Sequence, residues 1–540
     1  MFSNWNKWSI IVFIIALLII SPILTIFYSA FLGDTSLWPH LFSTVLPRYT
    51  LNTLILMIGV GSLSLIFGIS TAWVVTRYDF PGKNIFEWAL LLPAAVPAYV
   101  IAYTYTDLFE YAGPVQNSLR TIFNWEGAQD YWFPNIRSMG GAILVMSSVL
   151  YPYIYLMGRS SFLRMPISFY QTGSIYGKNI FLTVALPLSR PAIIAGLALV
   201  LMETISDFGT VDYFAIETLT LGVFNVWLGM NSLSGASQIS SVLFIIVVIL
   251  LTLETIGRKN QRYFEKSSGQ NISSIIEAEG IRRLIYSFLC FMPILLGFII
   301  PTSVLLNFVL KGFAVINFQE IFSAMFTSLY IAIISSILVI SVSILMITVS
   351  YFRSNKFQKF LIFISSCGYA FPGTILAVGV IVFVGLLDNF FKFNFNYYTG
   401  GIIILLFSYT IRFLAVGNGA IKSGVTKINP NLINVSKIMG FSFIKILRKT
   451  IIPLIYTNIF VGVTLVFVDI LKELPMTLLL RPFNFETLAT YVYQYASDEL
   501  LEECSLAALM IVIAGIGPVI LLNSAIKKTG KIRKSEPLIY

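Results

Sequence analysis

Residues 185–208 read ALPLSRPAIIAGLALVLMETISDF, and residues 451–474 read IIPLIYTNIFVGVTLVFVDILKEL. Each stretch has a proline near its start, continues through apolar residues, and carries two acidic residues four positions apart near its end. The two stretches align without a gap, so that Pro187 lies opposite Pro453. An apolar run of about 20 residues has the length of a helix that crosses the hydrocarbon core of a membrane. The pair therefore predicts a membrane protein with a duplicated plan.

The composition of the 540-residue chain agrees with this prediction. Only 11% of the residues are charged, 57% are hydrophobic, and the mean hydropathy is +0.85. A soluble domain of this size needs more charge to cover its surface, so lipid is the expected solvent. Cys290, Cys367 and Cys504 lie in or beside apolar runs without CxxC spacing, and we expect them to be small core residues. The single histidine, His40, excludes a histidine-rich metal cluster.

Charge-free runs of roughly 20 residues or more predict eleven membrane-spanning helices. They lie between residues 7 and 34, 48 and 77, 87 and 107, 137 and 159, 217 and 254, 283 and 311, 320 and 353, 359 and 388, 392 and 412, 449 and 469, and 503 and 527. A twelfth span is predicted after Arg190, where acidic residues interrupt the run, because this stretch matches the span that begins at Pro453. The expected fold class is an all-α integral membrane protein with twelve spans. The first run is too long for a signal-peptide core and should stay as a helix.

The distribution of basic residues predicts the orientation through the positive-inside rule. With the N-terminus in the cytoplasm, 27 of the 35 Lys and Arg residues fall in cytoplasmic segments. We therefore expect both termini to be cytoplasmic, in a bacterial plasma membrane, with anionic lipid as the partner of the +10 net charge. The charge thus indicates topology and not nucleic-acid binding. The outer loops are long and aromatic, notably at 111–137 and 474–502.

Further matches extend the repeat along the chain. LNTLILMIGVGSLSLIFGIS at Leu51 matches TSLYIAIISSILVISVSILM at Thr327, Pro97 matches Pro372, and Glu217 matches Glu486. The matched positions keep their order along the chain, while the number of residues that separates each matched pair changes slightly. Loop insertions in a duplicated chain produce this pattern. Six spans per half is an even number, so the halves should share one orientation as a parallel pseudo-twofold repeat. The predicted domains are a first membrane-spanning half at 1–257, a polar cytoplasmic linker at 258–283, and a second membrane-spanning half at 284–540.

The cytoplasmic loop after the fourth span of each half contains a recognisable motif. SKIMGFSFIKILRKTIIPLI begins at Ser436 and follows Asn434, and it resembles the EAA motif of binding-protein-dependent ABC importer permeases. That motif is Glu-Ala-Ala, a glycine four residues after the second alanine, and Leu-Pro about thirteen residues later; Gly440 and Pro453 stand at this spacing. In the first half the equivalent places are taken by Gln171, Thr172, Gly173 and Gly177, and Leu186-Pro187 closes the motif about three residues early.

The motif has a physical interpretation. Glycine permits a sharp turn between two short helices, proline begins the next helix without losing a needed donor, and the short helix between them can lie in a groove of an ATPase subunit. The motif glutamate is replaced by Gln171 in one half and Asn434 in the other, so neutral hydrogen bonds would replace an ion pair to the ATPase. Each loop alone is equally consistent with an amphipathic interfacial helix. Two copies at matching positions favour docking.

A narrower resemblance covers essentially the whole chain. LVLMETISDFGTVDYFAIETLTLGVFNVW, LKELPMTLLLRPFNFETLATYVYQYASDE and YPYIYLMGRSSFL are similar to stretches of the fused, double-length permeases of ferric-iron importers. The resemblance implies a type I importer fold, an extracytoplasmic binding protein that delivers Fe(III), and a pair of separate ATPase subunits that hydrolyse ATP. The sequence lacks a GxxxxGK[ST] phosphate loop. We therefore expect a transport subunit with no catalytic residues and no cofactor of its own.

Four carboxylates inside apolar runs are candidates for the translocation path. Glu203 and Asp207 share a helical face, and Asp469 and Glu473 repeat the spacing in the second half. Charges at such depth usually face a bundle interior or a pathway, and Fe(III) favours oxygen ligands. The alternative is that they lie at the outer helix ends, wetted by solvent and paired with Lys472 or Arg481.

Arg412 is the other charge within an apolar region. We expect it to end the fourth span of the second half, where it would reach the inner surface or pair locally. Other functions remain open at this point. Permeases for thiamine, polyamines or phosphonates share the same motifs, and a secondary transporter also uses repeats and buried charges, although the EAA-like loops would then have no role.

Overall fold

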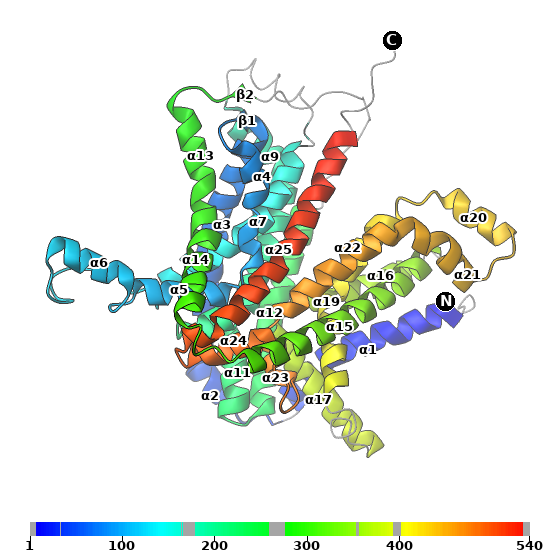
Figure 1. The fold of residues 1–540 in the computed structure, drawn as a ribbon. Coiled ribbons are helices and arrows are strands. Elements are labelled where there is room, and N and C mark those ends of the chain that lie inside the picture. Colours follow the sequence, from blue (N-terminus) through cyan, green and yellow to red (C-terminus); the bar gives the residue numbers. More distant parts are fainter. Residues whose placement is uncertain are drawn as a thin grey trace, which may run out of the picture. The chain divides into compact units, whose positions relative to one another are not determined.

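The computed structural model describes residues 7–32, 34–163, 165, 179–258, 276–352, 356–392 and 401–532. This part of the chain is almost entirely helical, with one pair of two-residue strands (Figure 1). Eleven of the described helices are long and apolar enough to cross a membrane, and one bent pair makes a twelfth if it is counted as a single span. The predicted all-α membrane fold with twelve spans is confirmed.

The chain forms two compact units, each built from both halves of the sequence. Unit 1 comprises Met1–Val45, Gly222–Phe244 and Asn317–Tyr491, and unit 2 comprises Leu46–Leu221, Ile245–Ile316 and Val492–Tyr540. The first span of each half therefore lies in the unit that the other half mainly forms. The predicted domains at 1–257 and 284–540 describe the duplication of the sequence and stay a prediction, whereas the compact units interleave these halves.

Unit 1 is organised around three helices that pack on one another, α15, α19 and α22. Helices α15 and α19 approach closely at Gly417, where an added Cβ would lie only 2.4 Å from Oγ of Ser343. Helix α1 packs on α17, and the Thr25 hydroxyl donates to the carbonyl of Gly379 at 2.9 Å. The helices are α1 (Lys7–Leu32), α2 (Trp38–Ser43), η3 (Asn225–Gly229), part of α12 (Leu233–Arg258), α15 (Phe318–Phe352), α16 (Lys356–Ser366), η5 (Cys367–Ala370), α17 (Gly373–Phe391), α19 (Ile402–Val425), α20 (Pro430–Ile438), α21 (Phe443–Ile446), η6 (Leu447–Ile451), α22 (Ile452–Leu471), α23 (Pro475–Leu480) and part of α24 (Leu488–Ser497).

Unit 2 repeats this arrangement with α3, α7 and α9. Helices α3 and α7 touch at Gly68, whose added Cβ would lie 2.7 Å from Ile154, and a Cβ added to Gly196 of α9 would lie 2.9 Å from Cα of the same residue. The elements are α3 (Leu46–Arg77), β1 (Tyr78–Asp79), α4 (Lys83–Ala89), η1 (Leu92–Ala95), α5 (Ala98–Phe109), α6 (Pro114–Phe123), α7 (Met139–Leu163), η2 (Phe181–Ala185), α9 (Leu186–Ser206), α10 (Gly209–Tyr213), β2 (Ile276–Glu277), α13 (Ile281–Ile294), η4 (Leu295–Ile299), α14 (Ile300–Lys311) and α25 (Leu501–Ile532), with α11 (Leu219–Phe224), α12 and α24 divided between the units.

The third span of each half is broken at the matched prolines. In unit 2 a 3₁₀ turn ends before Pro97, which starts α5, and in unit 1 another ends before Pro372, which starts α17. Proline has no N–H and restricts the residue before it to extended conformations, so an α-helix cannot continue through it. The span predicted between residues 87 and 107 is therefore not one straight helix, because the helices on either side of Pro97 are bent by 92°.

A second pair of matched prolines produces π-helical turns. The π segments η2 and η6 end two residues before Pro187 and Pro453, which lie opposite each other in the repeat. A third, η4, ends two residues before Pro301. Because proline removes a donor and its ring crowds the preceding turn, the helix widens locally to keep its remaining hydrogen bonds. The duplicated plan is confirmed at this level of detail.

The end of the predicted linker is anchored in unit 2. Ile276–Glu277 pairs in parallel with Tyr78–Asp79, and the Ala278 N–H donates to the Asp79 carbonyl at 3.0 Å. The Ser287 hydroxyl in α13 donates to the Pro81 carbonyl at 3.0 Å. The polar composition of this segment did not predict a strand.

Candidate functional site

The predicted coupling turn of the second half connects α20 to α21. Gly440 has φ +73°, and the N–H of Phe441 donates to the carbonyl of Ser436 at 3.1 Å. This six-to-one hydrogen bond with a left-handed residue just past the helix end is a Schellman motif. An added Cβ at Gly440 would meet nothing within 4 Å, so the backbone conformation and not lack of space requires glycine here.

The turn is connected to the long helix that follows it. The hydroxyls of Ser436 in α20 and Thr450 in η6 lie 3.2 Å apart, and Ser436 is buried. Pro453 then stands in the first turn of α22, which runs 20 residues to Leu471. A displacement of α20 would therefore reach α22 directly. Asn434 is exposed on the other side of α20, away from this contact.

Apolar residues on the outer face of α20 are exposed. Ile438 is 85% exposed and Met439 is 65% exposed, and the remaining members of the row, at helical spacing, are Leu432 and Val435. Helix α20 lies at the margin of unit 1 (Figure 1). An apolar helix face of this kind is suited to a groove in a partner protein.

Most of the first-half motif lies outside the described residues. This applies to Gln171, Thr172, Gly173 and Gly177. Only its closing proline, Pro187, is described, in the first turn of α9 directly after η2. It occupies the same place as Pro453 in the second half.

Two of the four candidate carboxylates are helix caps at equivalent positions. The Asp207 carboxylate accepts the N–H of Thr210 at 3.0 Å and that of Val211 at 3.2 Å, which starts α10. The Glu473 carboxylate accepts the N–H of Met476 at 3.4 Å, at the start of α23. An acidic side chain at a helix N-terminus satisfies an otherwise unpaired donor and interacts favourably with the helix dipole.

Glu473 also forms a buried ion pair with Arg412. Its carboxylate lies 3.2 Å from Nε of Arg412, and both side chains are buried. Arg412 Nη1 also donates to the carbonyl of Phe371, next to the Pro372 break, at 3.2 Å. An added Cβ on Gly373 would lie 2.7 Å from Glu473, so a glycine is needed beneath the pair.

This geometry corrects the prediction for Arg412. Helix α19 continues to Val425, so Arg412 lies within the span and does not end it. Its partner Glu473 follows α22, across the unit, and is not local. A predicted span that is ended at the first charged residue is too short when that residue is buried and paired in the tertiary structure.

The remaining carboxylates also have contacts close by. Asp469 lies 3.0 Å from Lys472, three residues along the chain, as the alternative interpretation expected. Arg481 pairs with Glu486 and not with a candidate carboxylate. Glu203 is half-buried on α9. A role of these side chains in the translocation path stays a prediction.

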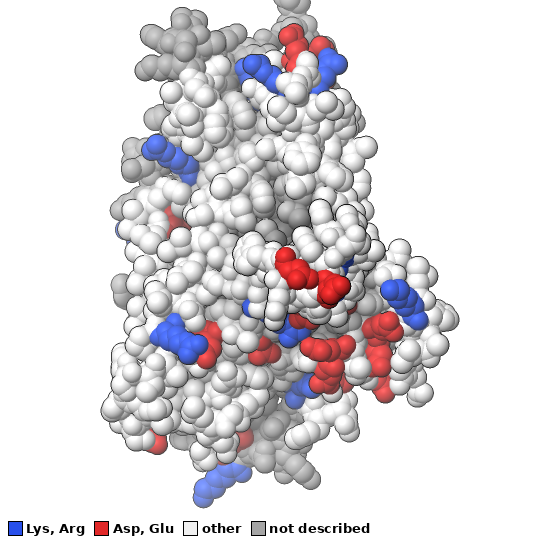
Figure 2. All heavy atoms as spheres, turned by 90° about the vertical axis from the view of Figure 1, so that its left-hand side faces the viewer, with Lys and Arg blue, Asp and Glu red and all other residues white. Residues whose placement is uncertain are grey.

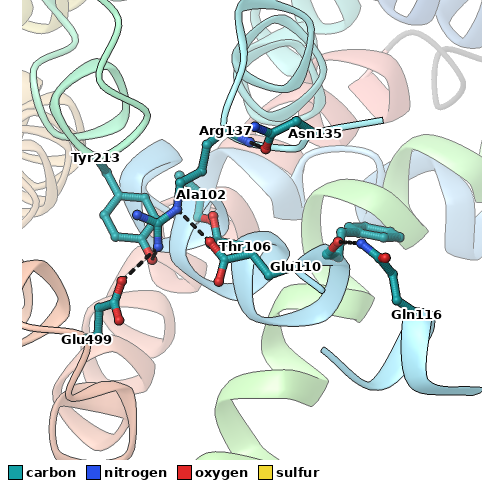
Figure 3. A network of polar contacts seen from close by, with 9 residues as sticks. Ala102, Thr106, Glu110, Gln116, Asn135, Arg137, Tyr213 and Glu499 are labelled. Atoms are coloured by element: carbon teal, nitrogen blue, oxygen red, sulfur yellow. Dashed lines mark hydrogen bonds and ion pairs between the residues drawn. The ribbon is translucent and has the colours of Figure 1, made fainter. Parts of the chain in front are cut away.

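A polar network that the sequence did not predict joins four segments of unit 2. Figure 3 shows Arg137 between Glu110, Glu499 and the ring of Tyr213. Arg137 lies 2.7 Å from the Glu110 carboxylate and 3.0 Å from that of Glu499, and its guanidinium centre is 4.8 Å from the ring centroid of Tyr213. Glu499 has φ +61° and follows α24 in the place that Gly440 takes after α20. The network thus fixes the end of α5, the start of α7, and the loop before α25.

Carboxylates outnumber cations around this network. Asp107 interacts electrostatically with Lys311, Glu110 and Glu502, and Figure 2, which looks onto the side from which α6 projects, shows acidic side chains gathered on this face. We call Asp107, Glu110, Glu499 and Glu502 the acidic rim. Within the described part of the chain, no group of three or more His, Cys, Asp or Glu side chains is arranged to hold a metal ion.

Residues 343–528 match the family described as binding-protein-dependent transport system inner membrane component. A Haemophilus influenzae protein named Fe(3+)-transport system permease protein FbpB 2 is 24% identical over 483 residues, which cover 87% of this chain and 88% of the relative. The resemblance to double-length permeases predicted from the sequence is confirmed by this nearly full-length similarity.

Shorter relatives match only part of the chain. The sulfate transport system permease protein CysW of Escherichia coli K12 is 27% identical over 39% of this chain and 71% of its own length. The molybdenum transport system permease protein ModB of Haemophilus influenzae is 29% identical over 31% of this chain and 73% of its own length. A match of most of the relative to about a third of this chain is expected if each half corresponds to one whole single-length permease.

Proposed function

We propose that this chain, whose residues 343–528 match the binding-protein-dependent transport family, is the membrane permease of an ABC importer. The observation that supports this function best is the turn at Gly440 between α20 and α21, with an exposed apolar helix face beside it. In this proposal a pair of separate ATPase subunits binds the cytoplasmic loops, and an extracytoplasmic binding protein delivers the cargo. ATP is hydrolysed by the partners, and this chain is not an enzyme and uses no cofactor.

The coupling step would use the apolar row on α20. Closure of the ATPase dimer would displace α20, and the contact between Ser436 and Thr450 would transmit the movement to α22. At its far end α22 leads to Glu473, which is paired with Arg412. One rigid helix would therefore connect the ATPase contact to the broken third span at Pro372, because Arg412 also bonds the carbonyl of Phe371.

We propose Fe(III) as the cargo. The relative that aligns along nearly the full length of this chain is named as an Fe(3+) permease, whereas the sulfate and molybdenum permeases align with about a third of it. The acidic rim also favours a cation. Arg137 pairs with two of its four carboxylates, and Lys311 interacts with a third, Asp107, so these carboxylates outnumber the two cations. A negative potential near the mouth of a pathway concentrates cations and repels oxyanions.

Two residues at one position test the coupling proposal. Valine at Gly440 is strained because β-branched residues rarely adopt positive φ, whereas asparagine tolerates it. Gly440→Val should abolish import and co-purification of the ATPase while the protein still inserts, and Gly440→Asn should retain both. Equal ATPase binding and uptake by Gly440→Val and the wild type would refute docking at this turn.

Cargo is tested separately. Cells that express this chain with its binding protein and ATPase, in a strain without other importers, are supplied with radioactive ferric iron, sulfate or molybdate. The proposal expects energy-dependent uptake of iron alone. Uptake of either oxyanion instead of iron would refute the iron assignment while leaving the importer function intact.

A further inference from the structure

Helix α6 is amphipathic, and its polar side is turned toward its own loop. Gln116 donates to the carbonyl of Phe109 at 2.7 Å, and Asn117 donates to that of Ala112 at 2.8 Å. Arg120 donates to the carbonyl of Tyr111 at 2.8 Å. These bonds fold α6 back on the end of α5, so its hydrogen-bonding side chains are occupied within the loop.

The apolar side of the same segment is exposed. Ile122 is 70% exposed and Phe123 is 57% exposed, and Trp132 in the following loop is 86% exposed. Phe123 stacks on Trp125 at 4.8 Å between ring centroids, and Trp125 stacks on Tyr131 at 4.6 Å. A helix that binds its polar residues inward and shows aromatic residues outward is unfavourable in water, because the exposed apolar area remains hydrated.

The polar end of the loop closes on itself. The Asp130 carboxylate accepts the N–H of Gly127 at 2.9 Å and that of Glu126 at 2.7 Å, and these two bonds lower the pKa of Asp130. The Arg120 guanidinium also bonds the hydroxyl of Tyr131 at 2.9 Å. The loop is thus internally bonded, and its aromatic residues are held on a fixed scaffold.

The level of α6 along the membrane normal can be inferred from α14, the helix against which α5 lies. Val100 and Thr104 in α5 line the same small cavity as Leu305 and Phe308 in α14. These residues of α14 lie within two turns of Lys311, where the span Ile281–Lys311 ends. Figure 1 shows α6 continuing from α5 and extending away from α13 and α14, across their direction. It therefore lies at the level where this span leaves the hydrocarbon core.

We propose that residues 111–133 form an interfacial anchor, in which the apolar side of α6 inserts into the bilayer leaflet at which the span Ile281–Lys311 ends. Amphipathic helices parallel to a membrane bury their apolar side at the boundary between headgroups and acyl chains. Tryptophan and tyrosine are enriched at the same depth. The anchor would fix the end of α5, and with it the Glu110–Arg137 contact, relative to the membrane surface. This inference does not depend on the cargo.

A bilayer fits this surface better than the binding protein. Leu306 and Leu310 of α14, close to the same end of the span Ile281–Lys311, are also exposed apolar residues. The exposed members of the anchor, Ile122, Phe123 and Trp132, carry no charge. A transient protein–protein interface usually has a polar rim. A soluble binding protein would also make its contact outside the membrane, not at the level where a span ends.

Photo-cross-linking distinguishes these partners directly. The photoreactive amino acid benzoylphenylalanine replaces Phe123 in one variant and Thr121, on the opposite side of α6, in the other. The full-length protein is placed in nanodiscs of phosphatidylethanolamine and phosphatidylglycerol, irradiated with and without the binding protein, and its intact mass is measured. We expect phospholipid adducts at Phe123, about tenfold more than at Thr121 and unchanged by the binding protein.

Two outcomes would overturn the anchor. One is a cross-link from Phe123 to the binding protein that replaces the lipid adduct. The other is equal and low lipid adduct formation at both positions, which would place α6 in water. As a second measurement, Ile122→Asp should weaken the lipid adduct at Phe123 about threefold or more while co-purification of the ATPase stays unchanged, because charge at this depth is unfavourable. An unchanged adduct in this variant would also contradict the proposal.

Discussion

The buried pair between Arg412 and Glu473 makes the sharpest prediction for stability. Replacement of Glu473 by methionine leaves the Arg412 guanidinium within a span, with the carbonyl of Phe371 as its remaining hydrogen-bond acceptor among the described residues. The side chains of the pair are 8% and 7% exposed, and their charged atoms are 3.2 Å apart. Solvent therefore cannot replace the missing partner.

The size of the effect can be estimated from this geometry. Two unit charges at 3.2 Å attract by about 5 kcal/mol at an effective dielectric constant of about 20. Removing one member of a buried pair typically costs about 3–5 kcal/mol, because the other charge stays buried and unpaired. In the double variant Arg412→Met, Glu473→Met no charge remains, and we expect a loss of about 1–2 kcal/mol, mainly from the lost cap of α23.

The assay is unfolding of the purified protein in mixed micelles with increasing SDS, from which differences in unfolding free energy are obtained. Lys472→Met is the matched control, since its pair with Asp469 is 22–29% exposed and should contribute about 0–1 kcal/mol. A loss of unfolding free energy in Glu473→Met no larger than that in Lys472→Met would refute the predicted role of the buried pair. This role is also refuted if the double variant is less stable than Glu473→Met alone.

Three further outcomes are expected. Glu203→Gln combined with Asp469→Asn should slow ferric uptake about tenfold, or about 1.4 kcal/mol in a barrier, without loss of ATPase assembly; unchanged uptake would leave these carboxylates as helix-end charges. A membrane-impermeant maleimide should label Phe483→Cys in intact cells and Ile438→Cys only after lysis, and identical labelling would contradict the predicted topology. Thr53→Val should lower the unfolding free energy by about 1–3 kcal/mol, because the hydroxyl that caps a buried backbone N–H is lost, and Thr53→Ser should not; equal losses would indicate packing as the cause.

The two halves of the repeat show that the pattern of apolar residues does not fix which residues are equivalent. The N–H of Leu219 donates to the Thr53 hydroxyl at 3.0 Å, and the N–H of Leu488 donates to the Ser328 hydroxyl at 2.7 Å. These equivalent caps place Thr53 opposite Ser328, one residue from the register that follows from aligning the runs at Leu51 and Thr327. Apolar runs define a span but contain little information on register, whereas a buried hydrogen bond requires one particular residue.

The ion-pair partner of a basic residue was predictable from the sequence only where the two residues are close together along the chain. Lys472 pairs with Asp469 within one helical turn, which the sequence favours. Arg412 in α19 pairs with a residue beyond α22, and Arg159 in α7 lies 3.1 Å from Glu87 in α4. The sequence shows an arginine inside an apolar region, and such a residue needs an acidic partner. It does not show which acidic residue that partner is.

The sequence by itself determined that the chain spans a membrane, that its plan is duplicated, and that proline and glycine stand at matched turns. These properties are local, because hydrophobic length, the missing N–H of proline and the positive φ of Gly440 act within a few residues. Only the tertiary structure decided which charges pair between distant segments, and that α1 and α13 lie in units formed mainly by the other half. Both properties depend on close packing between segments that are far apart in the chain. Apolar helices of similar composition could pack in many arrangements, and only the contacts of their small residues and buried charges select one of them.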